Sequence, residues 1–352
     1  MICAKRSNMR FIGGKTLLLP NILELIKNQA PMVNTVSDLF SGSGAVSRYL
    51  AENGYATYSN DLMYFSYVLL RGSICITTPI TFRGLDKLGI GDPIFWFNRI
   101  SYDWLKNNVS DNYFIYCNYS PYGDRRYFTE ENALRIDYIR LTIEEWKEKE
   151  LISDDEYFYL LCALIEAVPF VSNTTGVYGA YLKHWDRRAL KPLNLLHHKI
   201  VNPRTTHIAY NTDTLRLVSD IKVDLAYYDP PYNQRQYLPN YHVLETLAKY
   251  DHPTISGKTG LRNYDDQKSK FCSKNTVFEE AKRLVDNTKA EYIVFSYNSE
   301  GILSEEEIKE ILFSFGKEQS FQQIRLEYNR YKNASTKRNN NLAENLYFIR
   351  RK

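Results

Sequence analysis

Residues 225–237, LAYYDPPYNQRQY, place two prolines between an acid and an aromatic, directly after an apolar run. Proline cannot donate to a sheet ladder, so a buried strand is predicted to end just before Asp229. The carboxylate of Asp229 and the backbone carbonyl of Pro230 can both accept from one exocyclic amino group. Tyr232 can stack on the ring that bears this group. A simple strand terminator with a capping acid is the alternative, and it explains less of the pattern.

A glycine turn lies upstream, in residues 35–46, TVSDLFSGSGAV. The pattern predicts a short strand, a turn and the start of a helix, with Gly42 and Gly44 allowing a ligand to approach the backbone closely. Asp61 lies 19 positions after Gly42, at the end of the next predicted strand, where an acid can accept from both ribose hydroxyls. The glycines alone fit a tight turn equally well, but the acid at this distance favours a nucleoside ligand.

The segments around these two motifs predict the fold. Residues 134–152 and 154–168 carry apolar side chains at three- and four-residue spacing, which is typical of helices. Strand-like segments occur at 207–213, 222–232 and 291–298, and residues 321–331 and 344–351 flank an asparagine-rich loop. We therefore expect an α/β fold: a Rossmann-like, mostly parallel sheet with a C-terminal antiparallel hairpin and an inserted, mainly helical domain. The expected divisions are 1–70, 71–205 and 206–352.

Composition limits the function classes. The 352 residues carry a net charge of +4, which permits a polyanionic partner without requiring one. There is no apolar run of transmembrane length, and the first residues lack the apolar core of a signal peptide. The five cysteines are scattered without a CxxC pair, and the six histidines form no metal-ligand pattern. We expect a cytoplasmic protein with reduced thiols, no membrane contact and no metal.

The order of the motifs is informative. GGK at 13–15, DLFSGSG at 38–44, the acid Asp61 and DPPY at 229–232 together resemble the Dam-like class of DNA adenine-N6 methyltransferases. Residues 176–193 and 233–251 are similar to the restriction–modification branch of that class. The resemblance covers most of the chain and implies S-adenosylmethionine as cofactor, flipped adenine in double-stranded DNA as substrate, and a target-recognition domain in the insertion. It also implies a cognate restriction endonuclease as partner, with the methylase acting as a monomer or dimer.

The resemblance implies a role for each motif residue. On the residues alone, Gly13, Gly14 and Lys15 would be interpreted as a loose loop with a solvated lysine before a helix. The family assigns them, with Phe11, to the methionine part of the cofactor, and places Lys15 near its carboxylate. The remaining cofactor residues would be Asp38, Phe40, Gly42 and Gly44 in the same pocket, Asp61 at the ribose and Asp213 near the adenine amine, while Asp229, Pro230 and Tyr232 would hold the target base.

The insertion shows no broad basic excess, so DNA contacts are expected at local clusters. The clusters are YGDRRY at 122–127, with Arg125 and Arg126, and KHWDRR at 183–188, with Lys183, Arg187 and Arg188. Arginine suits guanine, and Asn173 could read adenine. A solvated charged surface is an equally good interpretation of either cluster. Further phosphate contacts are expected from Lys268 and Lys270, in a mobile loop at 258–274, and from Lys332, Lys337 and Arg338 in the hairpin loop.

Two other functions stay open from the sequence. An RNA adenine methyltransferase would use the same pocket with an insertion that reads RNA. A non-catalytic DNA-binding module would have a degenerate pocket, against which the intact DPPY and glycine motifs argue. A cytosine-C5 enzyme is disfavoured because the chain has no Pro-Cys pair to supply its nucleophile. Asp before PPY favours adenine over cytosine N4 as a tendency of the family.

Overall fold

The computed structural model describes residues 11–201, 205–328 and 342–352. The chain divides into two compact units. The sheet unit comprises Lys15–Leu62, Arg204–Tyr237 and Gln267–Lys352, and the helical unit comprises Met1–Gly14, Met63–Pro203 and Leu238–Asp266. The predicted insertion at 71–205 overlaps the segment Met63–Pro203 of the helical unit, and the predicted division of the chain stays a prediction. No local pattern in the sequence indicates that residues 238–266 also belong to this unit.

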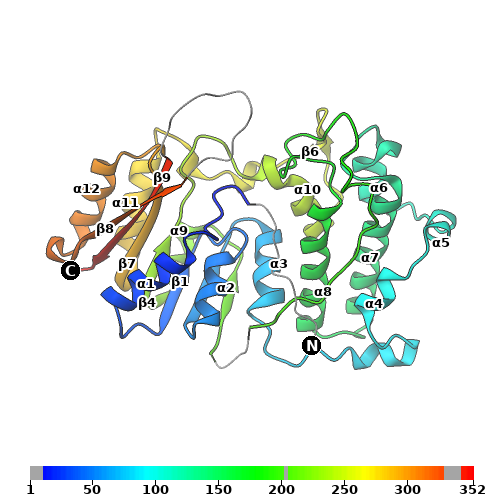
Figure 1. Cartoon of the computed structure of the whole chain (residues 1–352), viewed down its shortest axis with the longest axis horizontal. Helices are drawn as coiled ribbons and strands as arrows, with labels where there is room; N and C mark the ends of the chain where they lie inside the picture. Colours follow the sequence, from blue (N-terminus) through cyan, green and yellow to red (C-terminus); the bar gives the residue numbers. More distant parts are fainter. Residues whose placement is uncertain (1–10, 202–204, 329–341) are drawn as a thin grey trace. The chain divides into compact units, whose positions relative to one another are not determined.

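The sheet unit is built on seven strands in the order β3-β2-β1-β4-β7-β9-β8 (Figure 1). Neighbouring strands from β3 to β7 pair in parallel, whereas β9 is antiparallel to both β7 and β8. The predicted mostly parallel sheet and its C-terminal antiparallel hairpin are therefore confirmed. The strands are β1 Thr35–Asp38, β2 Ala56–Asn60, β3 Ile208–Tyr210, β4 Lys222–Tyr228, β7 Lys289–Asn298, β8 Gln322–Tyr328 and β9 Leu342–Arg350.

Helices cover both faces of this sheet. Because side chains alternate along a strand, Leu225 and Tyr227 of β4 pack into one core while Ala226 and Tyr228 pack into the other. Burial on both faces explains why β4 is a continuous apolar run rather than an alternating one. The first core includes residues of α1 Leu19–Gln29 and α2 Ala45–Glu52. The second core includes residues of α9 Thr214–Leu217, α11 Val277–Asn287 and α12 Glu305–Phe315. The unit also contains the short 3₁₀ helices η5 Lys270–Cys272 and η6 Glu318–Ser320.

The topology changes direction between β1 and β4. From β1 the chain goes to β2 on one side, whereas β4 pairs with the other side of β1. Open α/β sheets bind ligands at the carboxyl ends of the strands beside such a switch point. The register places Asp38, the last residue of β1, opposite Tyr227, two residues before Asp229. The glycine turn and the DPPY motif therefore leave neighbouring strands at the same edge of the sheet.

The helical unit is organised around α3 Tyr64–Ser73, α7 Glu130–Glu148, α8 Asp154–Ala167 and α10 Leu238–Lys249. Helix α3 lies very close to α8, since a Cβ built on Gly72 would lie 2.3 Å from the Phe158 carbonyl oxygen and 2.4 Å from the Cys162 Cβ. No larger residue fits there without moving a helix. The smaller elements are α4 Pro93–Asn98, α5 Tyr102–Asn107, α6 Phe114–Tyr119, η1 Arg83–Leu88, η2 Pro121–Gly123, η3 Val168–Phe170, η4 Asp265–Gln267 and the strand pair β5 Ile255–Ser256 and β6 Leu261–Arg262.

Three sequence expectations can be placed on this fold. Residues 258–274 are not a single loop, because they contain β6, η4 and η5 and pass from one unit into the other. The hairpin-loop lysines and arginine, Lys332, Lys337 and Arg338, lie outside the described residues. Within the described part of the chain, every helix is too short or too polar to cross a membrane.

Candidate active site

A buried ion-pair group lies where β4 ends. The Nζ atom of Lys15 lies 2.8 Å from Oδ1 of Asp229 and 3.1 Å from Oε1 of Glu344, which projects from β9. The side chains of Lys15 and Glu344 are 4% and 3% exposed, whereas that of Asp229 is 17% exposed. Asp229 is thus the member of this group whose side chain remains partly exposed.

Burial sets the electrostatics of this group. It raises the pKa of Asp229 above its ordinary value, and the nearby Lys15 ammonium opposes that rise. Burial alone would lower the pKa of Lys15, but the charges of Asp229 and Glu344 together outweigh this effect and hold it above its usual value. The lysine is therefore a fixed cation, and Asp229 is the group whose charge is sensitive to its surroundings.

The rest of the DPPY motif is positioned by neighbouring elements. The last pair of the β4–β7 ladder is Tyr228 with Phe295, which confirms that the strand ends before Asp229. Pro230 is buried, and the carbonyl of Tyr232 accepts from the backbone N–H of Ile302 at 2.9 Å. The Tyr232 ring meets that of Tyr297 edge-on, with 6.3 Å between the ring centroids. These contacts hold a half-buried tyrosine beside the exposed edge of the motif.

The glycine turn after β1 is tied to the predicted ribose acid. Gly42 and Gly44 have φ angles of 53° and 74°, which side chains with a Cβ rarely adopt. The backbone N–H of Gly42 donates to Oδ2 of Asp61 at 2.7 Å. The predicted association of the turn and the acid is therefore present in the structure, through a hydrogen bond that the sequence did not indicate. The role of Asp61 at a ribose stays a prediction.

Asp38 contributes a buried carboxylate at the end of β1. Its Oδ2 atom accepts from the hydroxyl of Ser47 at 2.7 Å, and Ser47 in turn accepts from Ser59 at 2.8 Å. Within the described residues, the Asp38 Oδ1 atom is buried and has no hydrogen-bond partner. Burial raises the pKa of Asp38 to about 6. A buried carboxylate oxygen of this kind suits a ligand cation or hydrogen-bond donor.

Three other predicted cofactor residues have local roles. Phe11, in the helical unit, stacks on Tyr241 with 4.6 Å between ring centroids. Phe40 meets Phe271 edge-on at 5.2 Å in the sheet unit. Asp213 is exposed and caps α9, its Oδ1 accepting from the N–H groups that follow it.

The glycines before Lys15 form a turn in the helical unit. Gly13 has a φ angle of 74°, and the N–H of Gly14 donates to the Phe11 carbonyl at 3.0 Å. Neither residue has a Cβ that would crowd this turn, which accounts for the glycine pair. The predicted cofactor contacts of these residues stay predictions.

The two basic clusters predicted in the insertion lie side by side. Arg126 donates to the backbone carbonyl of Lys183 at 2.7 Å. The amide of Asn173 donates to the carbonyls of Arg126 and Leu182 and accepts from the N–H of Asp186. Asn173 is fully buried, so the prediction that it reads adenine is wrong. Its side chain instead links the backbones of the two clusters and so holds them next to each other.

The arginines and lysines of these clusters differ in how many of their side-chain donors already bind other groups of the protein. Arg125 donates to the carbonyls of Asn118, Gly123 and Gly257, which joins α6 to the β5–β6 turn. Because these hydrogen bonds use the donors of its guanidinium, they count against the prediction that Arg125 contacts DNA. Arg188 pairs with Asp186 at 3.2 Å. The predicted DNA residues whose side chains are exposed are Arg126, Lys183, Arg187 and Arg188 in the helical unit and Lys268 and Lys270 in the sheet unit.

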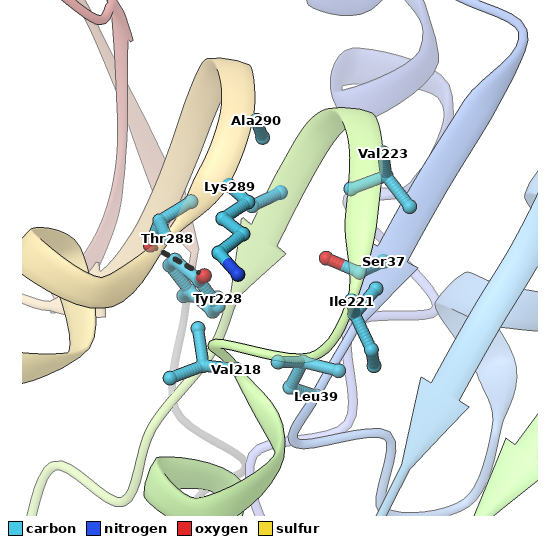
Figure 2. Close-up of a pocket in the computed structure, with 10 residues that line it drawn as sticks. Ser37, Leu39, Val218, Ile221, Val223, Tyr228, Thr288, Lys289 and Ala290 are labelled. Carbon is cyan, nitrogen blue, oxygen red and sulfur yellow. Dashed lines mark hydrogen bonds between the residues drawn. The ribbon is translucent and has the colours of Figure 1, made fainter.

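The sheet unit also contains a small apolar crevice. Figure 2 shows Val223 near the start of β4 and Ala290 at the start of β7 among its lining side chains, with the hydroxyls of Tyr228 and Thr288 bonded at 2.8 Å. Its empty volume of ≈ 160 Å³ includes space open to solvent, and ligand pockets usually have about 300–1,000 Å³. None of the predicted site residues lines it, so we do not assign the cofactor to this crevice.

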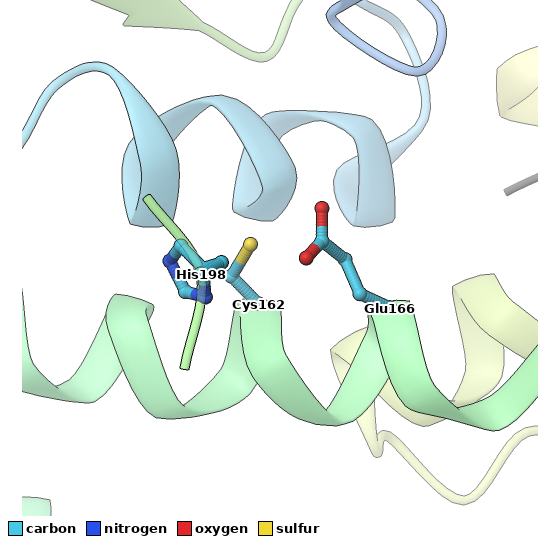
Figure 3. A group of neighbouring side chains, drawn as sticks. All are labelled: Cys162, Glu166 and His198. Atoms are coloured by element: carbon cyan, nitrogen blue, oxygen red, sulfur yellow. The ribbon is translucent and has the colours of Figure 1, made fainter. Parts of the chain in front are cut away.

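One group of side chains in the helical unit resembles a metal site. Figure 3 shows Cys162 and Glu166 on α8 with His198 beside them, and their ligand atoms lie within 4.8 Å of one another. The Nε2 atom of His198 lies 2.7 Å from the Gly72 carbonyl oxygen, and its ring stacks on Tyr159 at 4.1 Å. These contacts hold the imidazole in place without an ion. The expectation that the protein needs no metal stays a prediction.

This geometry can be compared with known proteins. The family model for D12 class N6 adenine-specific DNA methyltransferases matches residues 11–311, which include the glycine turn and the DPPY motif. The chain belongs to this family. The match confirms the resemblance recognised from the motif order, and it does so over most of the chain.

Several curated relatives of this D12 class chain carry methyltransferase names. The type II methyltransferase M.FokI of Planomicrobium okeanokoites is 44% identical over 346 residues, covering 97% of this chain and 53% of the relative. The modification methylase StsI of Streptococcus sanguinis is 38% identical, covering 98% and 52%. The type II methyltransferase M.NlaIII of Neisseria lactamica is 37% identical, covering 96% and 97%. The chain thus spans about half the length of the first two relatives and nearly all of the third.

Sequence reasoning missed one member of the site. Glu344 opens the predicted strand segment at 344–351 and was interpreted only as part of a hairpin. Its burial on β9 and its contact with Lys15 depend on the antiparallel pairing of β9 with β7, which brings it opposite Asn298. The available signal was an acid two positions before the apolar run 346–349 of that segment.

Proposed function

We propose that this D12 class chain transfers a methyl group from S-adenosylmethionine to the N6 amine of adenine in double-stranded DNA. The observation that carries the proposal is the partly exposed side chain of Asp229, whose carboxylate is held by Lys15 at the carboxyl end of β4 and which two prolines and Tyr232 follow. Family membership over residues 11–311 supports the same reaction.

The chemistry follows from charge and position. The lone pair of an adenine amine is delocalised into the ring, so the amine is a weak nucleophile. Hydrogen bonds from the amine to Asp229 and to the Pro230 carbonyl favour a more tetrahedral nitrogen and offset the positive charge that develops on it. The ring of Tyr232 would stack on the base and fix its orientation. The cofactor, when bound, supplies an already activated methyl group.

The residues at the end of β1 fit that cofactor. The buried Oδ1 atom of Asp38, which has no partner within the described residues, would accept from the ammonium of the methionine part. The turn carries no side chain at Gly42 or Gly44, and Asp61 lies next to it for the ribose. Phe40 and Asp213 are the further cofactor residues proposed in the sheet unit, and Lys15 is assigned to Asp229 rather than to the cofactor carboxylate. The cofactor contact of Phe11, in the helical unit, stays a prediction.

The substrate is proposed to be duplex DNA from which the target adenine is flipped. Base flipping costs about a few kcal/mol of lost stacking, and backbone contacts would repay it. The exposed residues Arg126, Lys183, Arg187 and Arg188 are the proposed contacts in the helical unit, and Lys268 and Lys270 those in the sheet unit. The names of the relatives support a role as the modification methylase of a restriction–modification system. The proposal further places the protein in the cytoplasm, as a monomer or dimer, with a cognate endonuclease as partner.

A transfer assay tests this function. Purified protein is incubated with methyl-labelled S-adenosylmethionine and duplex DNA, single-stranded DNA or ribosomal RNA, with a chelator present in parallel reactions. We expect label on N6 of adenine in duplex DNA, with the same rate in chelator. Label on RNA alone would favour the RNA methyltransferase, and DNA binding without any transfer would favour the non-catalytic module. Sequencing the methylated DNA would then identify the target site.

A further inference from the structure

Glu344 is a buried acid that neither the motif analysis nor the proposed reaction uses. Its Oε1 atom accepts from the hydroxyl of Ser296 at 2.8 Å and lies 3.1 Å from Nζ of Lys15. Its Oε2 atom accepts from the amide of Asn298 at 3.4 Å. Ser296 and Asn298 lie on β7, with exposed fractions of 0% and 4%. Both oxygens of Glu344 are therefore held by the neighbouring strand.

A buried ion pair normally contains one acid and one base. Here Lys15 contacts two carboxylates, so the group of Asp229, Lys15 and Glu344 carries one net negative charge when Asp229 is ionised. With Lys15 and Asp229 alone, the two charges would cancel at the place where the amine is proposed to become positive. A net negative charge there stabilises a developing positive charge, most strongly where water is excluded.

We propose that Glu344 is a positioning residue for methyl transfer, which holds Lys15 against Asp229 and compensates the lysine charge, so that the group of three keeps a net negative charge toward the target amine. This inference rests on the proposed function for its effect on rate. The arrangement itself, with Glu344 acting on Asp229 through Lys15, stands on the three side chains alone. Ser296 and Asn298 fix the position of Glu344, and through it the position of the lysine.

Charged and titratable groups face Asp229 from several neighbouring elements. Lys15 faces it from the segment before α1, Glu344 from β9 and Asp38 from β1, while Tyr227 precedes it on β4. The ring centroid of Tyr232 lies 5.7 Å from Nζ of Lys15. The negative charges of Glu344 and Asp38 raise the pKa of Asp229, and Lys15 lowers it. Within the group, Glu344 and Lys15 thus shift the pKa of Asp229 in opposite directions.

This opposition gives a direct test. Glu344→Gln removes a negative charge but keeps an oxygen for Ser296 and Lys15, so the pKa of Asp229 should fall. Lys15→Met removes the positive charge, so the pKa of Asp229 should rise. The measurement is the pH titration of the Asp229 carboxyl carbon by NMR in carbon-13-aspartate-labelled full-length protein, with Asp229→Asn to assign the signal. It needs neither DNA nor cofactor.

The rate readout uses single-turnover transfer over a range of pH. Transfer needs ionised Asp229, so the acid limb of the profile should move to lower pH in Glu344→Gln and to higher pH in Lys15→Met. At the plateau, Glu344→Gln should lose about tenfold in rate, which is less than the loss from removing a direct contact, with little change in the KM of either substrate. A matched control is Glu291→Gln, which removes an exposed acid on β7 that pairs with Arg350 on β9 at 2.8 Å.

The outcomes separate the two proposals. Opposite shifts of the Asp229 signal in the two variants support the arrangement, even if wild-type protein transfers no methyl group and the proposed function fails. Equal shifts, or the same shift in Glu344→Gln and Glu291→Gln, overturn it. If Glu344→Gln does not fold, the double variant Lys15→Met/Glu344→Gln keeps the same net charge as the wild type. Its Asp229 pKa must then lie below that of Lys15→Met alone, and a value equal to or above that of Lys15→Met overturns the arrangement.

Discussion

In the sheet unit the charges of Lys15 and Glu344 are buried and paired, whereas in the helical unit those of Lys183 and Arg187 lie on the surface. A buried charge is costly unless its partners are fixed, so its position is defined by the fold around it. An exposed charge costs little and acts over a distance that salt controls. We infer that the first region sets the rate of the reaction and the second sets the affinity for DNA.

The largest effect should come from the acid that belongs to the buried group but remains partly exposed. Asp229→Ala removes an acceptor fixed at the point where positive charge develops, which should lower the transfer rate about 100- to 1000-fold. The fold should persist, because Asp229 follows the end of β4 and Lys15 keeps Glu344 as its buried partner. Single-turnover transfer, with circular dichroism to confirm folding, makes the measurement. Near-native transfer would show that Asp229 does not hold the target base.

Tyr232 tests whether the ring, rather than its hydroxyl, is used. Stacking on a base is worth about 1–3 kcal/mol, so Tyr232→Ala should lower both the rate and the capture of a flipped base. Tyr232→Phe keeps the ring and should be mild. The readout is fluorescence of 2-aminopurine at the target position, followed during a single turnover. Equal losses in the two variants would instead assign the function to the hydroxyl.

The positions of Asp229 and Tyr232 just after the end of a strand could be predicted from the sequence. Two consecutive prolines end a ladder whatever the tertiary context, and the glycines at 42 and 44 are needed for left-handed backbone, so both sites followed from local chemistry. The parallel sheet followed from β4, whose continuous apolar run requires cover on both faces. The partners of Lys15 could not be predicted in the same way. Glu344 lies 329 positions later in the chain, and it reaches Lys15 only because β9 pairs with β7.

The helical unit was harder to predict for the same reason. Asn173 and Arg125 have the side chains of base readers, and nothing in the sequence shows that their donors are used by backbone carbonyls. Residues 238–266 join this unit because α10 packs on α3 and α8, contacts that no local pattern reports. Burial of a polar side chain depends on tertiary structure, so the sequence identifies the residue type but not its use.

A pH dependence follows from the second buried acid of the sheet unit. Burial raises the pKa of Asp38 to about 6. If its carboxylate binds the ammonium of the methionine part, protonation removes that attraction, and cofactor affinity should fall as the pH falls below about 6. Each pH unit below the pKa should cost up to about tenfold in affinity. Calorimetry of S-adenosylmethionine binding from pH 5 to 8 measures this, with Asp38→Asn as the control. A wild-type affinity that does not change over this range would place the ammonium elsewhere.

The smallest effect should come from the surface. Arg187 is exposed, and an arginine that contacts a phosphate contributes roughly one unit to the slope of log affinity against log salt. Arg187→Gln should therefore weaken DNA binding to a similar extent for all sequences, reduce that slope by about one and leave thermal stability unchanged. Arg125→Gln is the contrasting variant, since its guanidinium joins α6 to the β5–β6 turn through Asn118 and Gly257. It should lower the melting temperature. If Arg187→Gln changes stability and not the salt slope, the exposed cluster is structural and the contrast between the two regions is lost.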